Sequence, residues 1–356
     1  QIRFASYKSL ALKTFSQQPV SAIYFNFMKD FYAARELLKQ HAIKIYEDDF
    51  RPDDRYLMER FITAKTAFIG TESTRSNNHA NVHRNVPKKY LALKNAKCKP
   101  SDCDIHLSMV SIDIECAMNG DMHGELYSIG AYSDVEQVVF MIGKEDSTAP
   151  SYIRWVEDEY ALLVQFIAWF NDYDADVVIG WNVINFDFDL LQKRCDLRKL
   201  NFTIGRDGRS PYWRKNRNSD SKYIAIAGRV VLDGIDLLKT ATYSFPSFSL
   251  ENVSRELLGL GKKVDNVESR LAEITENFIN NKAALAKYNL EDCRLVWLIF
   301  EKTHLLEFAM LRAQLTGLEL DRIGGSVAAF TNLYLPKLHR AGYVAPNMGD
   351  GTSGLV

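Results

Sequence analysis

The chain has 356 residues, of which 47% are hydrophobic and 25% charged, and its formal net charge is -1. This composition is that of an ordinary globular protein with room for two or three domains, and the balanced charge gives no global signal for a nucleic-acid partner. No window approaches 18 uncharged apolar residues, and the start Gln1–Phe4 lacks the pattern of a secretion signal, so no membrane span or leader is predicted. The five cysteines are an odd number and favour free thiols over a disulfide framework.

The first hundred residues predict a small domain that contains both helices and strands. Residues 20–27 are rich in β-branched and apolar side chains and predict a strand, and residues 43–46 predict another. Between them, residues 30–41 have the apolar spacing of a helix, and a further short helix is predicted from Arg51. A mostly polar stretch follows, so we place a domain boundary near residue 105.

Beyond this boundary the pattern predicts a mixed sheet with helices packed on it. Three strands come first, then a helix, then a short strand whose Val-Val-Ile run needs cover on both faces. A long polar insertion is predicted at residues 193–229. The predicted fold class is therefore α/β (α+β), preceded by a smaller α+β domain. The predicted strands are 107–115, 125–132, 136–142, 176–180 and 230–233, and the predicted helices are 157–173, 249–258 (with Ser249 as N-cap), 282–300 and further helices within 303–340.

Two carboxylates end the first strand of this predicted sheet. Asp113 and Glu115 are two residues apart, so on a strand their side chains point to the same face. Like charges buried side by side are costly unless a cation lies between them, which makes the pair a candidate metal site. The alternative is a strand that simply runs out into solvent, because Asp-x-Glu is a frequent tripeptide.

Two later segments carry acids in comparable settings. The segment Gly180-Trp-Asn-Val-Ile-Asn-Phe-Asp187 follows a short strand, so Asp187 would lie at the beginning of a helix. The segment Tyr288-Asn-Leu-Glu-Asp292 lies on a long helix, where positions four apart share a face. Taken alone, Asp187 could be only a helix cap, and Asp292 only a solvated surface acid.

Together the three segments can bring four carboxylates to one end of the sheet. Each pair at about 4 Å would repel by several kcal/mol at an intermediate dielectric, so the cluster requires cations. Oxygen ligands without His or Cys favour Mg2+ or Mn2+, and two such ions about 3.5–4 Å apart support phosphodiester hydrolysis. The hydroxyl of Tyr288, which keeps its proton at neutral pH, is predicted to orient the attacking water. The predicted metal-binding and catalytic carboxylates are Asp113, Glu115, Asp187 and Asp292.

These motifs resemble those of the 3′–5′ proofreading exonuclease of family B DNA polymerases, in particular the bacterial DNA polymerase II branch. The runs Ser111-Ile-Asp-Ile-Glu115, Gly180–Asp187 and Tyr288–Asp292 match its three exonuclease motifs in order. The flanking segments select the branch. They are Tyr56-Leu-Met-Glu-Arg-Phe-Ile-Thr63, Ser247-Phe-Ser-Leu-Glu-Asn-Val253, Gly324-Gly-Ser-Val-Ala-Ala-Phe330 and His339-Arg-Ala-Gly-Tyr-Val-Ala-Pro-Asn347.

The resemblance implies a ribonuclease H-like mixed sheet with flanking helices. It places an N-terminal domain at residues 1–105, the exonuclease domain at 106–305, and a helical segment leading to a palm at 306–356. By motif match, Asp113 would bridge two Mg2+ or Mn2+ ions and Asp187 would act on the second of them. The nucleophile-side ion would be held by Glu115 and Asp292. The residues that match family contacts to a frayed DNA 3′ end are Asn182, Phe186, Ser249 and Leu250.

Three further features have two interpretations each. Trp181 is interpreted as core rather than as a DNA contact, and Asp233, at a predicted strand end, as structural. The insertion at 193–229 mixes basic side chains with Tyr212, Trp213 and Tyr223, which suits a nucleic-acid strand. A solvated loop is the alternative for the insertion.

The function expected from the resemblance is editing of DNA 3′ ends. The family's palm motifs do not occur in the sequence, so the chain is expected to be part of a longer DNA-directed DNA polymerase and not to synthesise DNA itself. The implied partner is DNA, either as a single-stranded 3′ end or as a primer-template. The expected location is a bacterial cytoplasm, with no membrane partner. A sliding clamp would be contacted through the missing C-terminal part. Two alternatives stay open: an RNA-processing 3′–5′ exoribonuclease with the same acid-and-tyrosine set, and a non-catalytic DNA-binding module.

Overall fold

The structure is a computed structural model that describes residues 3–72, 93–117, 124–215, 220–260, 267–322 and 325–347. Two compact units are present. One combines Gln1–Gly70, Asn95–Cys103 and Met310–Val356, and the other combines Thr71–Lys94 and Asp104–Ala309. The predicted domain limits near residues 105 and 305 remain a prediction.

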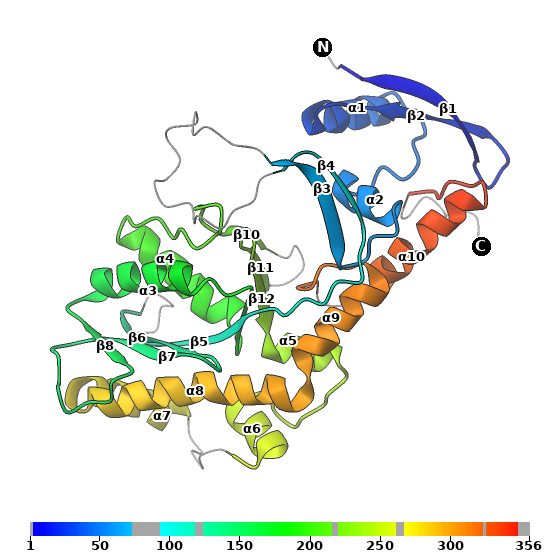
Figure 1. Ribbon diagram of the computed structural model, residues 1–356. Helices are drawn as coiled ribbons and strands as arrows, with labels where there is room; N and C mark the ends of the chain where they lie inside the picture. Colours follow the sequence, from blue (N-terminus) through cyan, green and yellow to red (C-terminus); the bar gives the residue numbers. More distant parts are fainter. Residues whose placement is uncertain are drawn as a thin grey trace. The chain divides into compact units, whose positions relative to one another are not determined.

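The unit that contains both chain ends mixes helices and short strand pairs (Figure 1). Its predicted strand at residues 43–46 is wrong, because Ala42 and Glu47 at its two ends have φ angles of 53° and 54° and turn the backbone out of the extended conformation. Instead, the carbonyl oxygen of Ile45 accepts a hydrogen bond from Asn347. Two strand pairs are present: β1 (Ser6–Lys13) with β2 (Pro19–Tyr24), which are antiparallel, and β3 (Thr66–Glu72) with β4 (Leu93–Pro100). The helices are α1 (Met28–Gln40), α2 (Pro52–Met58) and α10 (Ser326–Arg340). A further helix, α9 (Leu305–Thr316), begins in the other unit and ends in this one.

A charged cluster joins sequence-distant parts of this unit. The Nε2 atom of His339 on α10 lies 2.8 Å from Glu47 Oε1, its Nδ1 atom contacts Glu59, and Arg55 donates to Glu47 at 2.6 Å. Burial opposes the charged form of His339, but the hydrogen bond and charge of Glu47 raise its pKa above the ordinary value. The cluster therefore ties α10 to α2 and to the loop that precedes it.

The other unit is built on a six-stranded sheet, and the prediction of a mixed sheet is confirmed. Its strand order is β12-β9-β5-β6-β7-β8, with parallel pairs at β12/β9, β9/β5 and β7/β8 and antiparallel pairs at β5/β6 and β6/β7. β8 was not predicted, and the other five agree with the predicted strands. The strands are β5 (Met109–Cys116), β6 (Leu126–Tyr132), β7 (Gln137–Ile142), β8 (Ile153–Val156), β9 (Val177–Gly180) and β12 (Val230–Asp233).

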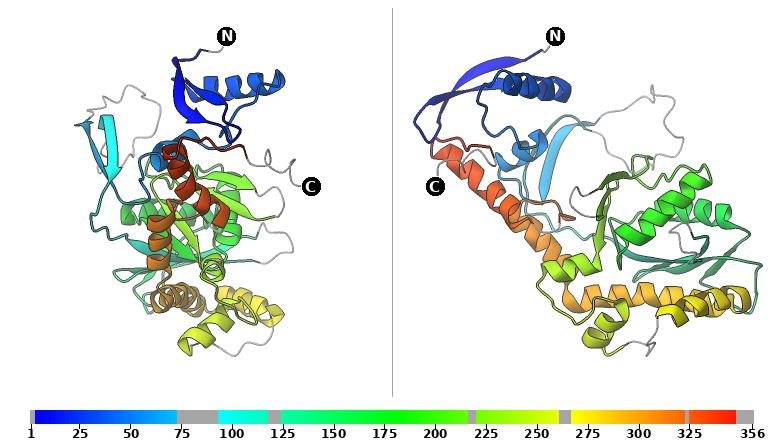
Figure 2. Two further views of the ribbon diagram at one scale, coloured as in Figure 1. Left: turned by 90° about the vertical axis from the view of Figure 1, so that its right-hand side faces the viewer. Right: turned by 180° about the vertical axis from the view of Figure 1, so that it is seen from behind.

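Helices cover both faces of this sheet (Figures 1 and 2). On one face, α3 (Glu159–Tyr173) and α4 (Asp189–Leu197) close a core into which β5 places Val110, Ile112 and Ile114. On the other face lies α8 (Lys282–Thr303), which packs against β5, β6 and β7. Side chains alternate along a strand, so the odd-numbered residues of β5, including Asp113 and Glu115, face α8.

The prediction of a polar insertion at residues 193–229 was wrong in part. Phe202, Ile204, Ile224 and Ile226 are buried in the core of the sheet unit, because the segment folds back on the sheet. Within it, β10 (Tyr212–Lys215) and β11 (Lys222–Ala225) form an antiparallel pair. Among the described residues, no helix is both long enough and apolar enough to cross a membrane.

Candidate active site

Three carboxylates from two elements converge between β5 and α8. Oxygen atoms of Asp113, Glu115 and Asp292 lie within 4.8 Å of one another. The strand supplies the first two because residues 113 and 115 share its α8-facing side, opposite Gly130 and Ser128 of β6. A bulge in the β5/β6 pairing follows directly after Glu115. This group of three can hold a metal ion, as the sequence predicts, and its hard oxygen ligands suit Mg2+ or Mn2+.

The helix that supplies Asp292 also supplies Tyr288. α8 begins after Asn281, whose side chain accepts a hydrogen bond from the backbone N–H of Ala284 at 3.1 Å as an N-cap. Its apolar residues, among them Leu285 and Leu290, are buried against the sheet and fix the rotation of the helix. Tyr288 is half-buried and lies one turn before Asp292, so both side chains project from the same helix face.

Asp187 lies in a short π-helix, η1 (Ile184–Phe188), between β9 and α4. Its side chain is 1% exposed, and its Oδ1 atom accepts a hydrogen bond from the backbone N–H of Ile114 at 3.1 Å. The Asp187 carboxylate therefore contacts β5 at Ile114, the residue between Asp113 and Glu115. It does not belong to the group of three carboxylates. The sequence predicts Asp187 at the beginning of a helix, whereas the structure places it in this π-helix.

Repulsion among these acids is visible in their pKa values. Burial, followed by the charges of Asp187, Asp292 and Glu115, raises the pKa of Asp113 well above its usual range. Burial likewise raises the pKa of Asp187, although backbone amides oppose the shift. A divalent cation would reverse this tendency, because it stabilises ionised carboxylates.

Sequence reasoning missed Asn289, which follows Tyr288 on α8. Its side chain is fully buried, and its Nδ2 atom donates to Asp113 Oδ2 at 2.7 Å. Its Oδ1 atom accepts from the Ser128 hydroxyl at 3.0 Å. The available signal was spacing, because residues three apart share a helix face and Asn289 is three before Asp292.

The predicted DNA contacts lie on two segments of the sheet unit. Asn182 is exposed and has a φ of 58°, and Phe186 is half-buried against the core. Ser249 is confirmed as the N-cap of α6 (Leu250–Leu258), with its hydroxyl accepting from Asn252 N–H, and Leu250 is buried. Their roles in binding DNA remain predictions.

Trp181 and Asp233 both make hydrogen bonds within the sheet unit. Trp181 is half-buried and donates from Nε1 to the carbonyl oxygen of Phe248 at 2.9 Å. Asp233 ends β12 and caps α5 (Gly234–Thr240) through a 3.0 Å bond from the N–H of Ile235. Burial, with a contribution from Asp236, nevertheless raises the pKa of Asp233 to about 7.

Asp233→Asn is expected to remove a pH dependence of stability. The folded-state pKa of about 7 exceeds the usual 3.8, so the folded protein binds more protons than the unfolded chain between these values. Stability should therefore fall as pH rises from 4 to 7, and the variant should avoid this loss while its amide oxygen still caps α5. Urea unfolding in EDTA should find the variant more stable at pH 8 than wild type, by up to about 4 kcal/mol, and similar at pH 4.5. An equal difference at both pH values would contradict the assignment.

The basic side chains of residues 193–229 are mostly used inside the unit. Arg206 binds Asp174 and Asp176, each at 2.8 Å, and Lys222 binds Asp189 at 2.5 Å. Further such pairs are Arg194–Glu159, Arg198–Glu159, Arg229–Asp174 and Lys193–Asp189. Within the described part of the chain, Lys199, Arg214 and Lys215 are exposed and make no ion pair. Basic composition alone therefore overstated the charge available to a nucleic acid.

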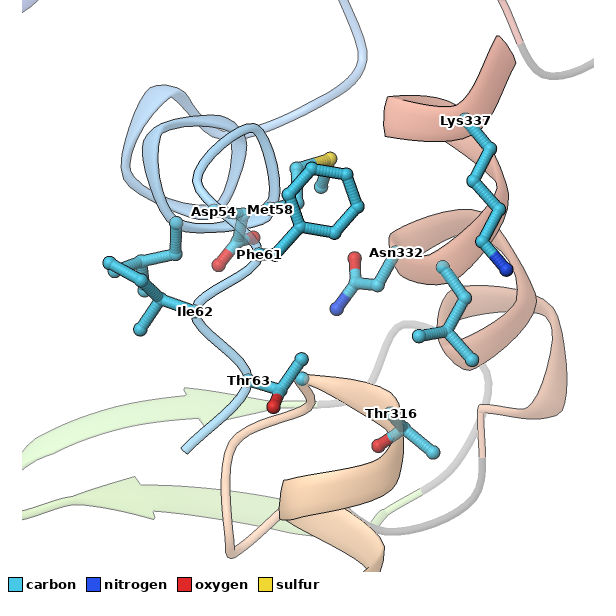
Figure 3. Close-up of a pocket in the computed structure, with 11 residues that line it drawn as sticks. Asp54, Met58, Phe61, Ile62, Thr63, Thr316, Asn332 and Lys337 are labelled. Atoms are coloured by element: carbon cyan, nitrogen blue, oxygen red, sulfur yellow. The ribbon is translucent and has the colours of Figure 1, made fainter. Parts of the chain in front are cut away.

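A separate pocket occurs in the unit that contains the chain ends. Figure 3 shows it between α2 and α10, with Phe61, Asn332 and Lys337 among the residues that line it. Its cavity volume is about 60 Å³. Asp54 is its one carboxylate-bearing lining residue, so it does not offer a second acidic cluster.

Comparisons with known proteins decide the family. The model of the DNA polymerase family B exonuclease domain matches residues 43–253. The chain belongs to this family. It is 43% identical over 346 residues to DNA polymerase II of Escherichia coli (strain K12), covering 96% of this chain and 42% of that protein, which supports the bacterial branch.

More distant relatives agree with this membership in family B. The chain is 26% identical over 317 residues to a DNA polymerase of Thermococcus kodakarensis, covering 86% of this chain and 16% of that one. The structure of the family B DNA polymerase from Pyrobaculum calidifontis superposes with a TM-score of 0.72 at 18% identity, covering 97% of this chain and 43% of that one. This likeness confirms the fold class and is consistent with a ribonuclease H-like exonuclease. The chain thus spans less than half the length of these relatives.

Proposed function

We propose that this family B exonuclease removes nucleotides from single-stranded or mispaired DNA 3′ ends and releases nucleoside monophosphates. The convergence of Asp113, Glu115 and Asp292 within 4.8 Å carries the proposal. A partly buried cluster of acids has little use in folding, because its members repel one another, whereas it matches the needs of phosphoryl chemistry.

Each of the predicted catalytic residues would have its own role. Two Mg2+ or Mn2+ ions would supply water activation and stabilisation of the leaving oxygen. Asp113 would contact both ions, Glu115 and Asp292 would hold one of them, and Asp187 would act on the other. Tyr288 donates or accepts a hydrogen bond at the attacking water and orients it, without giving up its own proton.

The remaining predicted residues would hold the DNA end. Phe186 offers a ring for stacking, where each base gains about 1–3 kcal/mol, and Asn182 offers an exposed amide. Ser249 and Leu250 would contact the same strand from the start of α6. The charges of Arg214 and Lys215 would lie along phosphates, which makes binding sensitive to salt.

We further propose that the chain is part of a bacterial, cytoplasmic DNA-directed DNA polymerase. The support is the identity to DNA polymerase II, of which the chain matches 42%. In this proposal residues 1–105 form the N-terminal domain, 106–305 the exonuclease domain, and 306–356 lead to the palm. A sliding clamp would be contacted by the part of the polymerase that the chain does not include.

A primer with a mispaired 3′ nucleotide tests the proposal. With Mn2+, the purified chain should shorten it from the 3′ end, and thin-layer chromatography should identify nucleoside monophosphates. A 3′-phosphorothioate linkage in the last position serves as the control and should slow cleavage.

Two other outcomes would replace the proposal. RNA cleaved faster than single-stranded DNA of equal sequence would indicate an RNA-processing exonuclease. Binding to DNA without any shortening in Mg2+ or Mn2+ would indicate a non-catalytic module.

A further inference from the structure

We infer that Asn289 is a positioning residue that holds the Asp113 carboxylate in the orientation required for binding metal. The inference rests on the proposed metal site and deepens it. The roles proposed for this helix so far belong to Tyr288 and Asp292, and Asn289 lies between them.

The first support is the contact itself. Asn289 is fully buried on α8, and its amide Nδ2 lies 2.7 Å from Asp113 Oδ2 across 176 residues of sequence. The terminal torsion of an Asp side chain is broad, so a carboxylate without a fixed donor can rotate. A donor on Oδ2 limits this rotation and leaves Oδ1 for a cation shared with Glu115 or Asp292.

The second support is the group behind the amide. An Asn side chain can present either its oxygen or its nitrogen to a neighbour, and the surrounding bonds decide which. The hydroxyl of Ser128 donates to Asn289 Oδ1 at 3.0 Å, and this leaves Nδ2 for Asp113. Ser128 stands opposite Glu115 on β6, directly before the bulge in the β5/β6 pairing.

The third support is the space made for the amide. Gly130 on β6 stands opposite Asp113, and a Cβ atom there would lie 3.0 Å from both Cγ and Oδ1 of Asn289. The same Cβ would lie 3.1 Å from the sulfur of Cys293, one turn further along α8. The missing side chain at residue 130 therefore lets α8 approach closely enough for the bond to form.

Loss of the Asn289 hydrogen bond is expected to weaken metal binding, as loss of similar bonds does in other metal sites. Loss of a hydrogen-bond partner that orients a metal ligand typically costs about 10–100-fold in metal affinity or activity. A side chain that only fills space would not produce this loss when replaced by an apolar group of similar volume.

The test compares Mn2+ binding by calorimetry, without DNA, in the full 356-residue chain. The double variant Ser128→Ala with Asn289→Leu removes the donor and its support while keeping volume, and it should bind Mn2+ about 10–100-fold more weakly. Asn289→Ala removes the same donor without overpacking and gives a second measurement if the double variant does not fold. Ser254→Ala, a buried hydroxyl that bonds within its own helix, is the control and should bind as wild type.

Activity adds an independent measurement. In the Asn289 variants the Mn2+ concentration for half-maximal cleavage should rise. At saturating Mn2+, the cleavage rate should be reduced by a smaller factor than the Mn2+ affinity. Folded variants that bind Mn2+ within about twofold of wild type would overturn the inference and leave the exonuclease proposal standing, since the loss expected for an orienting bond is at least tenfold. Absence of Mn2+ binding by wild type would instead overturn the metal site, and the inference with it.

Discussion

Replacement of Asp113 and Glu115 together by Ala is expected to lower the rate of 3′-end cleavage by at least about 10³-fold. The pair supplies two of the three converging carboxylates. These would hold the metal ions, whose charge would stabilise the transition state by several kcal/mol, where about 1.4 kcal/mol corresponds to tenfold. The measurement is single-turnover cleavage of a mismatched primer in Mn2+. Cleavage by the variant at the wild-type rate would show that a contaminating nuclease, or another site in the chain, is responsible for the cleavage.

The same double variant should also separate catalysis from folding. Removal of buried like charges relieves repulsion, so the melting temperature in EDTA should stay equal or rise, while the stabilisation by Mn2+ should disappear. Asp134→Ala with Glu157→Ala changes the net charge equally at two exposed positions and serves as control. The control should keep both the cleavage rate and the response to Mn2+.

Glu159→Ala is expected to destabilise the sheet unit by about 3–5 kcal/mol, because it removes the carboxylate of a buried ion pair with Arg194. The Glu159 side chain is fully buried and binds Arg194 at 2.6 and 2.5 Å, Arg198 at 2.7 Å and the backbone N–H of Leu126 at 3.0 Å. Although burial alone would raise it, these partners lower the pKa of Glu159. Its contribution is therefore present above the ordinary pKa of 4.5 and lost as pH falls through the folded value.

Urea unfolding followed by tryptophan fluorescence measures this loss. Glu125→Ala is the matched control, because Glu125 lies 3.9 Å from the same Arg198 but is 64% exposed, so its removal should cost less than about 1 kcal/mol. A similar loss in both variants would show that burial of the Glu159 pair does not determine its contribution.

The sequence predicted the sheet and the acids well because their signals are local. The alternation around Asp113 and Glu115 marks a strand, and the four-residue spacing of Tyr288 and Asp292 marks a helix face, whatever lies around them. The strand at 43–46 failed because positive φ angles at Ala42 and Glu47 carry no strong signal in those residue types. Composition likewise could not show that Arg206 and Arg229 are bound by acids far away in sequence.

The contacts that complete the site could not be predicted, because they join residues that are distant in sequence. Asn289 has an ordinary place on a helix, and only the close approach of Gly130 explains why its amide reaches Asp113. Asp187 was found, but its bond to the Ile114 amide depends on a π-turn that propensity does not predict.

The distance along the chain between β5 and α8 sets when the site can exist during synthesis. Asp113 and its α8 partner Asn289 are 176 residues apart, so at about 5–20 residues per second the helix follows the strand by roughly 10 to 35 s. During that interval β5 has its acids but neither the third carboxylate nor the amide that orients Asp113. A ribosome-bound chain therefore cannot assemble the acid cluster until nearly the whole sheet unit has been made, and the proposed nuclease activity would arrive together with the completed fold.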